Sequence, residues 1–426
     1  MRQITESNRR MGAILAFGLV PLSGLATDLY LPSFPEMTQV FHTPDTAIQQ
    51  TLAVFLISYG LAQFFAGTIM DSFGRYRPTL IAIAVFILTN LLIVSTRNIE
   101  LVYVYRAFQG ICAAFIAVGK RTYFVDAYTG KQQKSYTALL TIVWAAAPIT
   151  APFLGGFLQQ HFSWQSCFYF LAAYAFVFLV LDLVFSGETL KKKKAEFKLR
   201  PIIKTYAKLL NTRDFTAGMV ILGLCYGMVM AFNMSVPFIV EHKFHLSPVV
   251  TGYCALFSGI AMFLGGLMGR RTGISKLFTK AWIWAAVQLA VIVLMLASAR
   301  SLDNLILLMA FVITIHMIQG LLYNLFFTHC LTRFPNNAAT AGGITSGGSY
   351  VVVSLALGLL LGLLSVTDQK MLAVCYLVLS ASMIGLMFLF RRSITKANED
   401  MLAGELREPA HPGLKDAQSP EACTIV

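Results

Sequence analysis

Long apolar segments separated by short polar ones dominate the pattern along this chain. Each segment holds about 20 mostly apolar residues, the length that an α-helix needs to cross the hydrocarbon core of a bilayer. The pattern therefore predicts an all-α membrane protein with twelve transmembrane helices. The expected spans lie at roughly 11–33, 47–70, 78–96, 100–122, 136–158, 165–186, 215–240, 250–269, 277–299, 303–327, 340–364 and 370–390.

One polar stretch, residues 187–214, is longer than the others between spans and contains four consecutive lysines. It separates six predicted spans from the other six. We therefore expect four parts, namely an N-terminal six-helix bundle, a basic cytoplasmic linker, a C-terminal six-helix bundle and a disordered cytoplasmic tail. Their predicted limits are 1–190, 191–213, 214–392 and 393–426. The lysines are expected to lie in solvent beside the anionic inner leaflet.

A short match between the halves indicates an internal repeat. The chain has glycines at 67 and 74 after the second span and at 266 and 273 after the eighth, so both pairs are offset by the same interval (266 − 67 = 273 − 74 = 199). Two six-helix repeats with a substrate site between them, near the middle of the membrane, form a known transporter architecture. Chance glycines at helix ends remain the alternative.

The composition agrees with a membrane protein and explains its charge. Hydrophobic residues make up 57% and charged residues 12% of the chain, and 33 Lys and Arg against 20 Asp and Glu give a net charge of +13. Soluble domains are about 25% charged, so a soluble enzyme, a disordered chain, a secreted disulfide scaffold and a nucleic-acid partner are excluded. The basic residues lie mostly in alternate loops. This positive-inside bias predicts that both termini are cytoplasmic.

Cofactor and catalytic motifs are not visible in the sequence. The seven cysteines are scattered, without paired or metal-ligand spacing. No glycine-rich loop ends in Gly-Lys-Ser/Thr, so ATP is not the expected energy source. We therefore expect no cofactor, no metal site and no enzymatic activity.

Two charges inside predicted spans, Asp28 and Arg106, are the main candidates for chemistry, because an intramembrane ionisable group is functional by default. Asp28 lies about five residues from the outer end of its span and Arg106 about six from the outer start of its own. At 1.5 Å per residue, both lie roughly 8–9 Å below the outer boundary. Burial favours a neutral carboxyl, whereas a nearby guanidinium favours an ionised one. A change in their separation would then exchange a proton. A static ion pair is the alternative.

Other polar positions within spans suggest a cavity. His316, Gln319 and Tyr323 recur on one face of the tenth span, which must face protein or water rather than lipid. They are expected either to line a cavity or to hydrogen-bond between helices. Asp182, near the inner end of the sixth span, is expected to reach the interface or to pair with a loop lysine. The full set of cavity candidates is Tyr30, Tyr59, Gln63, Gln109, Trp144, Phe232, Asn233, His316, Gln319 and Tyr323.

Four local patterns resemble the major facilitator superfamily, and within it the drug:proton antiporters of the bicyclomycin/chloramphenicol-resistance type. Gly67-x3-Asp71-x2-Gly74-Arg75-x-Arg77 is similar to the family's loop after the second span, which acts as a cytoplasmic gate. Here a serine and a tyrosine stand at 72 and 76, where basic residues are common.

The other three patterns lie within spans one, four and five. Arg106-x2-Gln109 resembles the signature that carries the family's buried, proton-linked arginine, and Asp28-x-Tyr30-Leu-Pro resembles a run found in the bicyclomycin-resistance subgroup. The fifth span is similar to the antiporter signature, although alanine stands at 147 and 151 where glycine is usual. The residues of this antiporter motif are Pro148, Pro152, Gly155 and Gly156.

This resemblance implies a proton-coupled secondary transporter that exports drugs or other amphipathic small molecules from the cytoplasm by alternating access. It implies a monomer in the bacterial inner membrane, which interacts with a small-molecule substrate, protons and the lipid bilayer, and a role in antibiotic resistance. A dedicated exporter of one native metabolite, such as a siderophore, amino acid or peptide, is the alternative. Uptake by proton symport fits the antiporter signature less well, and a sensor or scaffold would leave Asp28 and Arg106 unexplained.

Overall fold

The structure is a computed structural model, and it describes residues 4, 6–190, 199–272, 277–299, 304–334, 338–393 and 395–396. Within these residues, twelve helical segments are long and apolar enough to cross a membrane. They coincide with the twelve predicted spans, so the predicted all-α fold class is confirmed. Most of the expected tail, and 191–198 of the expected linker, lie outside the described residues.

The first span is longer than the sequence indicated and is broken into four pieces. These are α1 (Glu6–Leu19), α2 (Leu22–Asp28), the 3-10 turn η1 (Leu31–Ser33) and α3 (Phe34–Phe41). Prolines at 32 and 35 occupy the first turns of η1 and α3, where a missing N–H group breaks no hydrogen bond. The helical segment therefore continues past its expected end at residue 33, and Asp28 lies at the break between α2 and η1.

Five further helices complete the first half. They are α4 (Asp45–Phe73), α5 (Tyr76–Ser95), α6 (Ile99–Ala127), α7 (Gly130–His161) and α8 (Trp164–Phe185).

After the amphipathic helix α9 (Leu199–Leu210), six spans form the second half. They are α10 (Arg213–Phe238) with the π turn η2 (Ile239–Lys243), α11 (Pro248–Thr272), α12 (Leu277–Ser298), α13 (Leu305–Thr332), α14 (Ala338–Leu363) and α15 (Gln369–Leu389).

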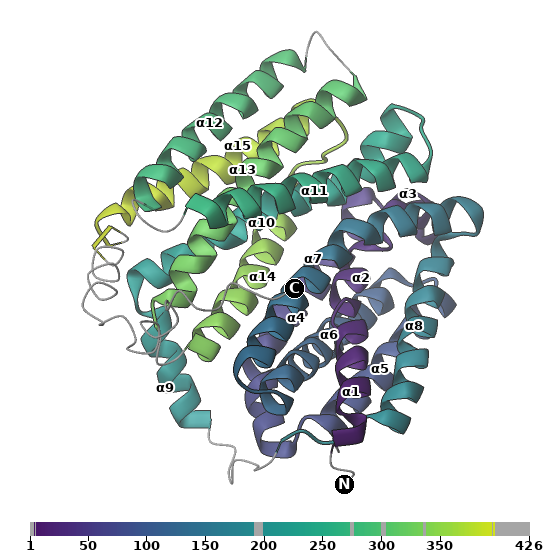
Figure 1. Cartoon of the computed structure of the whole chain (residues 1–426). Coiled ribbons are helices and arrows are strands. Elements are labelled where there is room, and N and C mark those ends of the chain that lie inside the picture. Colours follow the sequence, from purple (N-terminus) through teal and green to yellow (C-terminus); the bar gives the residue numbers. More distant parts are fainter. Residues whose placement is uncertain are drawn as a thin grey trace, which may run out of the picture.

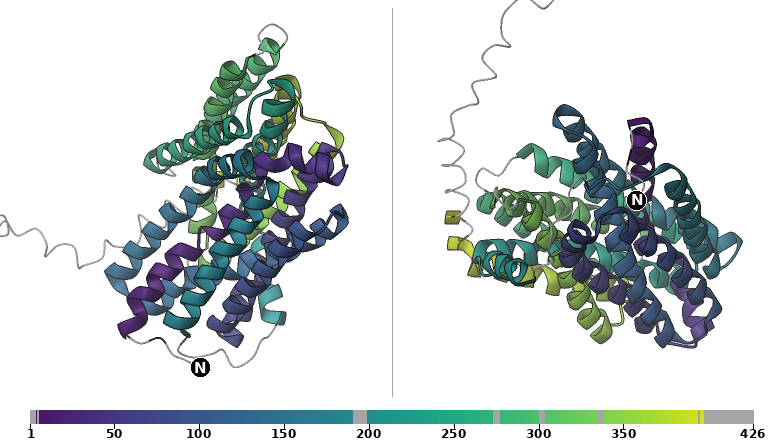
Figure 2. Two further views of the ribbon diagram at one scale, coloured as in Figure 1. Left: turned by 90° about the vertical axis from the view of Figure 1, so that its right-hand side faces the viewer. Right: turned by 90° about the horizontal axis from the view of Figure 1, so that it is seen from below.

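The two halves form separate groups of helices that lie against each other (Figure 1), and they also lie side by side when seen from below (Figure 2, right). The main contacts between them pair α4 with α14 and α7 with α11. Close backbone approach makes these contacts possible, because a Cβ atom on Gly60 of α4 would lie 2.6 Å from the carbonyl oxygen of Gly347 in α14. Small residues commonly allow such approach between membrane helices.

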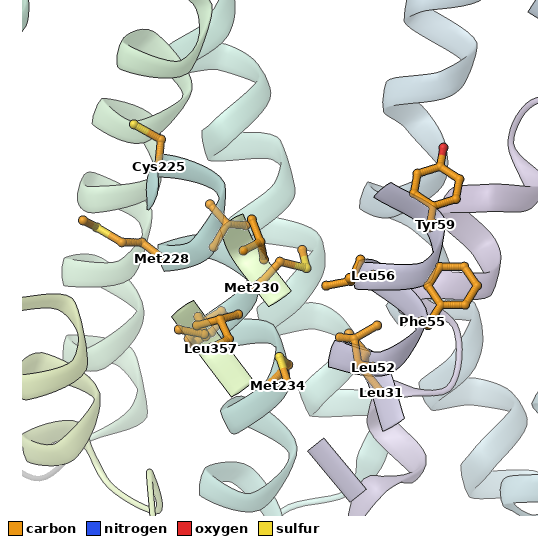
Figure 3. Packing of buried hydrophobic residues seen from close by; sticks show 14 of the residues in the cluster. Leu31, Leu52, Phe55, Leu56, Tyr59, Cys225, Met228, Met230, Met234 and Leu357 are labelled. Carbon is orange, nitrogen blue, oxygen red and sulfur yellow. The ribbon is translucent and has the colours of Figure 1, made fainter. Parts of the chain in front are cut away.

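The halves contact each other near the start of α4 and the ends of α10 and α14, at the end of the molecule opposite to the start of α1. Three side chains cross the interface to backbone carbonyl oxygens: Gln49 donates to Met234 (3.0 Å), Gln50 donates to Gly358 (2.8 Å) and Ser354 donates to Ala53 (2.6 Å). Between them, apolar side chains of α4 face those of α10 and α14, as Figure 3 shows for Leu52, Leu56, Met230, Met234 and Leu357. This end of the molecule is therefore closed.

Candidate functional site

The candidate site centres on Asp28, the last residue of α2, where the helix breaks before η1. Its side chain is fully buried, and neither carboxylate oxygen has a hydrogen-bond partner in the described part of the chain. Asn233 of α10, in the other half, is near enough to interact with it. A buried polar group without a partner is costly, so the position of Asp28 requires an explanation beyond stability.

A small cavity of about 10 Å³ lies beside this carboxyl group, and it has room for about one water molecule. Trp144 and Pro148 of α7 line it on one side, and its other walls come from α2, α4, α10 and α14. Because α2, α4 and α7 belong to the first half and α10 and α14 to the second, the cavity lies between the halves.

Tyrosines from both halves form the aromatic wall of this cavity. The rings of Tyr59 and Tyr350 lie 4.9 Å apart, and those of Tyr226 and Tyr350 lie 5.7 Å apart, each pair at 87°. Tyr323 extends the group, with its ring 6.4 Å from that of Tyr226. Electron-rich ring faces attract cations, so these rings and the neighbouring acidic group together favour positive charge at this position.

Arg106 of α6 is also fully buried, but it contacts rings and a carbonyl group instead of Asp28. Two of its nitrogens donate to the carbonyl oxygen of Ala26 (3.2 Å each), and one donates to Gln109 (2.7 Å). The guanidinium lies 4.4 Å from the ring centres of both Tyr30 and Phe55. Arg106 and Asp28 are thus carried by neighbouring elements, and in this conformation the carboxylate forms no ion pair with the guanidinium.

Of the polar stripe of α13, Tyr323 belongs to the aromatic group described above, whereas His316 and Gln319 lie within the second half, away from the cavity of Asp28. His316 shares hydrogen bonds with Ser258 of α11 (2.7 Å) and Tyr376 of α15 (2.9 Å). Gln319 donates to the side-chain oxygen of Gln288 in α12 (2.6 Å). Phe232 packs against the histidine ring at 5.5 Å. Of the two expected roles for this stripe, the structure shows interhelical hydrogen bonding.

The remaining cavity candidates divide into two groups. Tyr59 and Trp144 line the cavity beside Asp28. Tyr30 and Gln109 instead contact Arg106: the tyrosine ring packs against the guanidinium, and the amide oxygen of Gln109 accepts a hydrogen bond from it. Gln63 is buried in α4 and does not line the cavity.

The loop motif after α4 forms a network within the first half. Arg75 pairs with Asp71 (2.9 Å) and with Asp126 of α6. Glu188 accepts hydrogen bonds from the backbone N–H groups of Arg75 (3.0 Å) and Tyr76 (3.3 Å), the start of α5. The chain turns at Gly74, whose φ of 96° favours glycine. Arg77 lies apart from this network, on the side of α5 that faces α6.

The antiporter motif lies where α7 contacts both halves. A Cβ atom on Gly155 would overlap the carbonyl oxygen of Leu29 in the first half, and one on Gly156 would lie 2.5 Å from the carbonyl oxygen of Pro248 in α11. Pro148 and Pro152 lie inside the continuous helix α7.

Several residues of this region have positions that the sequence does not indicate. Tyr226 and Tyr350 read as ordinary aromatic residues of apolar spans, and only the fold brings them to Asp28. Asp182 pairs with Lys120 of α6 (2.6 Å), deep inside the first half, instead of with a loop lysine. In the part of the chain that the structure describes, no group of three or more His, Cys, Asp or Glu side chains could hold a metal ion.

Twelve membrane-spanning helices in two six-helix halves, with a buried acidic and aromatic site between the halves, define a multi-pass secondary transporter. The chain belongs to the Major Facilitator Superfamily, whose family model matches residues 16–357. Its members are transporters of small substrates, which agrees with the transport class predicted from the sequence.

Named relatives are bacterial. The chain is 29% identical to an uncharacterized MFS-type transporter, YdgK, of Bacillus subtilis, over 72% of this chain and 79% of the relative. It is 25% identical to multidrug resistance protein D of Escherichia coli, over 86% and 94%. A bicyclomycin resistance protein homolog of Haemophilus influenzae is 27% identical over 51% of this chain and 56% of the relative. These relatives confirm the predicted resemblance to the drug-resistance type of the superfamily.

Solved structures share the fold. The nucleoside transporter NupG superposes with a TM-score of 0.69 over 91% of this chain and 99% of that one, at 14% identity. A D-xylose-proton symporter superposes with a TM-score of 0.67 over 87% and 96%, at 12% identity.

Proposed function

We propose that this protein exports drugs or other amphipathic small molecules in exchange for protons. The observation that carries the proposal is Asp28, a fully buried carboxyl group without a hydrogen-bond partner in the described structure, beside tyrosines from both halves. The names of the relatives, multidrug resistance protein D and a bicyclomycin resistance protein homolog, support export of drugs.

The unpaired carboxyl group of Asp28 supplies the proton coupling. An ionised carboxylate in this environment would lose its hydration, and Asn233, the side chain near enough to interact with it, would replace only part of that hydration. The carboxyl group avoids this large cost by holding a proton. A cationic substrate beside the ring faces of Tyr59, Tyr226 and Tyr350 would compensate the negative charge. Substrate and proton then compete for one group, which is the requirement for exchange.

Arg106 would stabilise the ionised form of Asp28 in a second conformation. It lies beside Tyr30, and its two bonds to the carbonyl oxygen of Ala26 hold it near the end of α2. A movement of this helix end during the conformational change would bring Asp28 to the guanidinium. The ionised form would then be favoured, and the proton would be released.

The arrangement of the halves supports a proposal of alternating access. We propose that 1–190 and 214–392 move as two bodies around the site of Asp28, with 191–213 as their linker. The positive-inside bias supports cytoplasmic termini, which places the closed end described above on the extracellular side. We further propose that the protein works as a monomer in the inner membrane of a bacterium.

The test is transport by purified protein in liposomes with an imposed pH gradient, using tetraphenylphosphonium or ethidium as the cation. We expect Asp28→Asn to abolish uphill efflux and substrate-dependent proton flux while the variant stays folded. Glu100→Gln is the matched control, because it removes an exposed carboxylate from the first turn of α6. It should behave as wild type. Uphill efflux by Asp28→Asn at the wild-type rate would refute the proposal.

A dedicated exporter of one metabolite remains the second candidate, because an acidic aromatic site also suits a single amine-containing compound. Resistance and accumulation assays in a strain without its own efflux pumps separate the two. Resistance to several unrelated compounds supports polyspecific export, whereas accumulation of one cellular compound on deletion supports the dedicated function.

A further inference from the structure

A groove of about 520 Å³ lies on the first half, between α5 and α6, away from the site of Asp28. Its volume falls in the range of about 300–1,000 Å³ that is typical of ligand pockets. Helix α5 packs mainly against α6 and α8, so it is a peripheral helix of the bundle. Ile81 and Ile111, which line the groove, are 65% and 40% exposed. In a membrane-spanning protein such a surface faces lipid.

The shape of the groove follows from the sizes of its side chains. Ala82 of α5 and Cys112 of α6 are almost fully buried and small, so they form the floor. Larger apolar side chains, including those of Phe73, Ile81 and Phe115, form the walls. The lining is therefore suited to a hydrocarbon chain.

One end of the groove carries a charge. Arg77 is the second residue of α5, and it lines the groove with an exposed side chain. No hydrogen bond or ion pair joins it to another described residue, whereas its neighbour Arg75 is paired with Asp71 and Asp126. A free guanidinium at such a position binds phosphate oxygens well.

The length of the groove matches one leaflet of the bilayer. From Arg77 to Val85, the last α5 residue in the lining, the helix advances eight residues, or about 12 Å. Half of the hydrocarbon core is about 15 Å thick. With Arg77 at the cytoplasmic side, as the proposed orientation requires, the cation lies at the headgroups of the inner leaflet and the apolar lining lies below them.

We propose that this groove binds one anionic phospholipid of the inner leaflet, with an acyl chain along α5 and α6 and the phosphate on Arg77. The charge at one end and the apolar lining along one leaflet together fit this amphipathic ligand better than a compound without a headgroup. The proposal rests on the proposed orientation of the protein but not on proton-coupled export.

Native mass spectrometry of the purified protein tests the binding, with phosphatidylglycerol as the probe and phosphatidylcholine of the same chains as the comparison. An Arg near anionic headgroups contributes about 1 kcal/mol. Arg77→Gln should therefore weaken binding of the first phosphatidylglycerol molecule about fivefold and change binding of phosphatidylcholine little. Arg10→Gln removes an exposed arginine of α1 on the same side of the membrane and should bind as wild type. Equal weakening by both variants, or no weakening by Arg77→Gln, would overturn the proposal.

A second measurement locates the lipid. Ile81→Trp places a larger side chain on the exposed wall of the groove, so it should weaken binding of both lipids without disturbing the buried core. A photoactivatable phosphatidylglycerol should label peptides that contain 73–85 or 111–115, and labelling confined to other peptides would overturn the assignment. Neither readout involves transport, so a failure of this proposal is distinguishable from a failure of the export function.

Discussion

Gly156→Ala should shift the balance between the two conformations of this transporter. The new Cβ atom would lie 2.5 Å from the carbonyl oxygen of Pro248, across the interface between the halves. An unstrained contact needs about 3.5 Å, so α7 and α11 must separate by about 1 Å at this level. Overpacking of this kind costs about 1–3 kcal/mol. Only the conformation with these helices in contact bears that cost.

The gain in helix propensity from the same substitution does not alter this result. Alanine stabilises a helix interior by up to about 1 kcal/mol relative to glycine, but α7 is helical in both conformations and the gain cancels. The ratio of closed to open extracellular ends should therefore fall about 5- to 150-fold.

The assay is a distance measurement between nitroxide labels on Glu100 of the first half and Leu363 of the second, in a cysteine-free background. Both positions are exposed at the end that we propose is extracellular. In Gly156→Ala the population with the longer distance should rise. Gly155→Ala creates a clash within the first half, so it should lower the melting temperature and leave the distance distribution unchanged.

Gly385→Ala is the matched control, because a Cβ atom at this position of α15 would meet nothing within 4 Å. It should change neither the distances nor the melting temperature by more than the helix-propensity effect. A wild-type distance distribution in Gly156→Ala, in protein that remains folded, would refute the reasoning. A shift of the same size in Gly385→Ala would refute it equally.

Three further substitutions test individual contacts. Asp182→Asn leaves the buried ammonium of Lys120 unpaired and should destabilise the protein by about 3–5 kcal/mol, measured as a lower melting temperature. The double variant Asp182→Asn with Lys120→Met should partly restore the melting temperature. Arg106→Lys keeps the charge but loses the fork of bonds to a single carbonyl oxygen, so efflux should fall sharply; wild-type efflux would contradict this role. Tyr206→Phe removes the 2.5 Å hydrogen bond from α9 to the carbonyl oxygen of Phe64, which contributes about 0.5–1.5 kcal/mol. Amide hydrogen exchange across 199–210 should therefore become faster. Unchanged exchange would show that this bond does not hold α9.

The spans could be predicted from the sequence because each carries its own signal. A run of about 20 apolar residues is sufficient to identify a membrane helix, so all twelve were found. The end of the first span was wrong because prolines at 32 and 35 resemble a helix end. In the structure they begin η1 and α3, where proline is well accommodated.

The site was less predictable, because side-chain direction depends on how the helices pack. Asp28 was found because charge in an apolar span is rare. Tyr226 and Tyr350 were missed because a tyrosine in an apolar span gives no sign of the direction in which it points. For His316 the sequence leaves cavity lining and interhelical hydrogen bonding open, and only the packing of the helices shows that its ring bonds to Ser258 and Tyr376 inside the second half.

The contacts within each half differ in kind from the contacts between the halves. The ion pairs Asp71–Arg75 and Lys120–Asp182 lie within the first half, and Asp214–Arg333 (2.7 Å) lies within the second. The Lys120–Asp182 pair is buried, and a buried pair is costly to break, so it favours movement of the first half as a unit. The contacts described between the halves are neutral hydrogen bonds, glycine backbone contacts and apolar side chains. Each neutral bond contributes only about 0.5–1.5 kcal/mol, so contacts of this kind can form and separate as the two halves move.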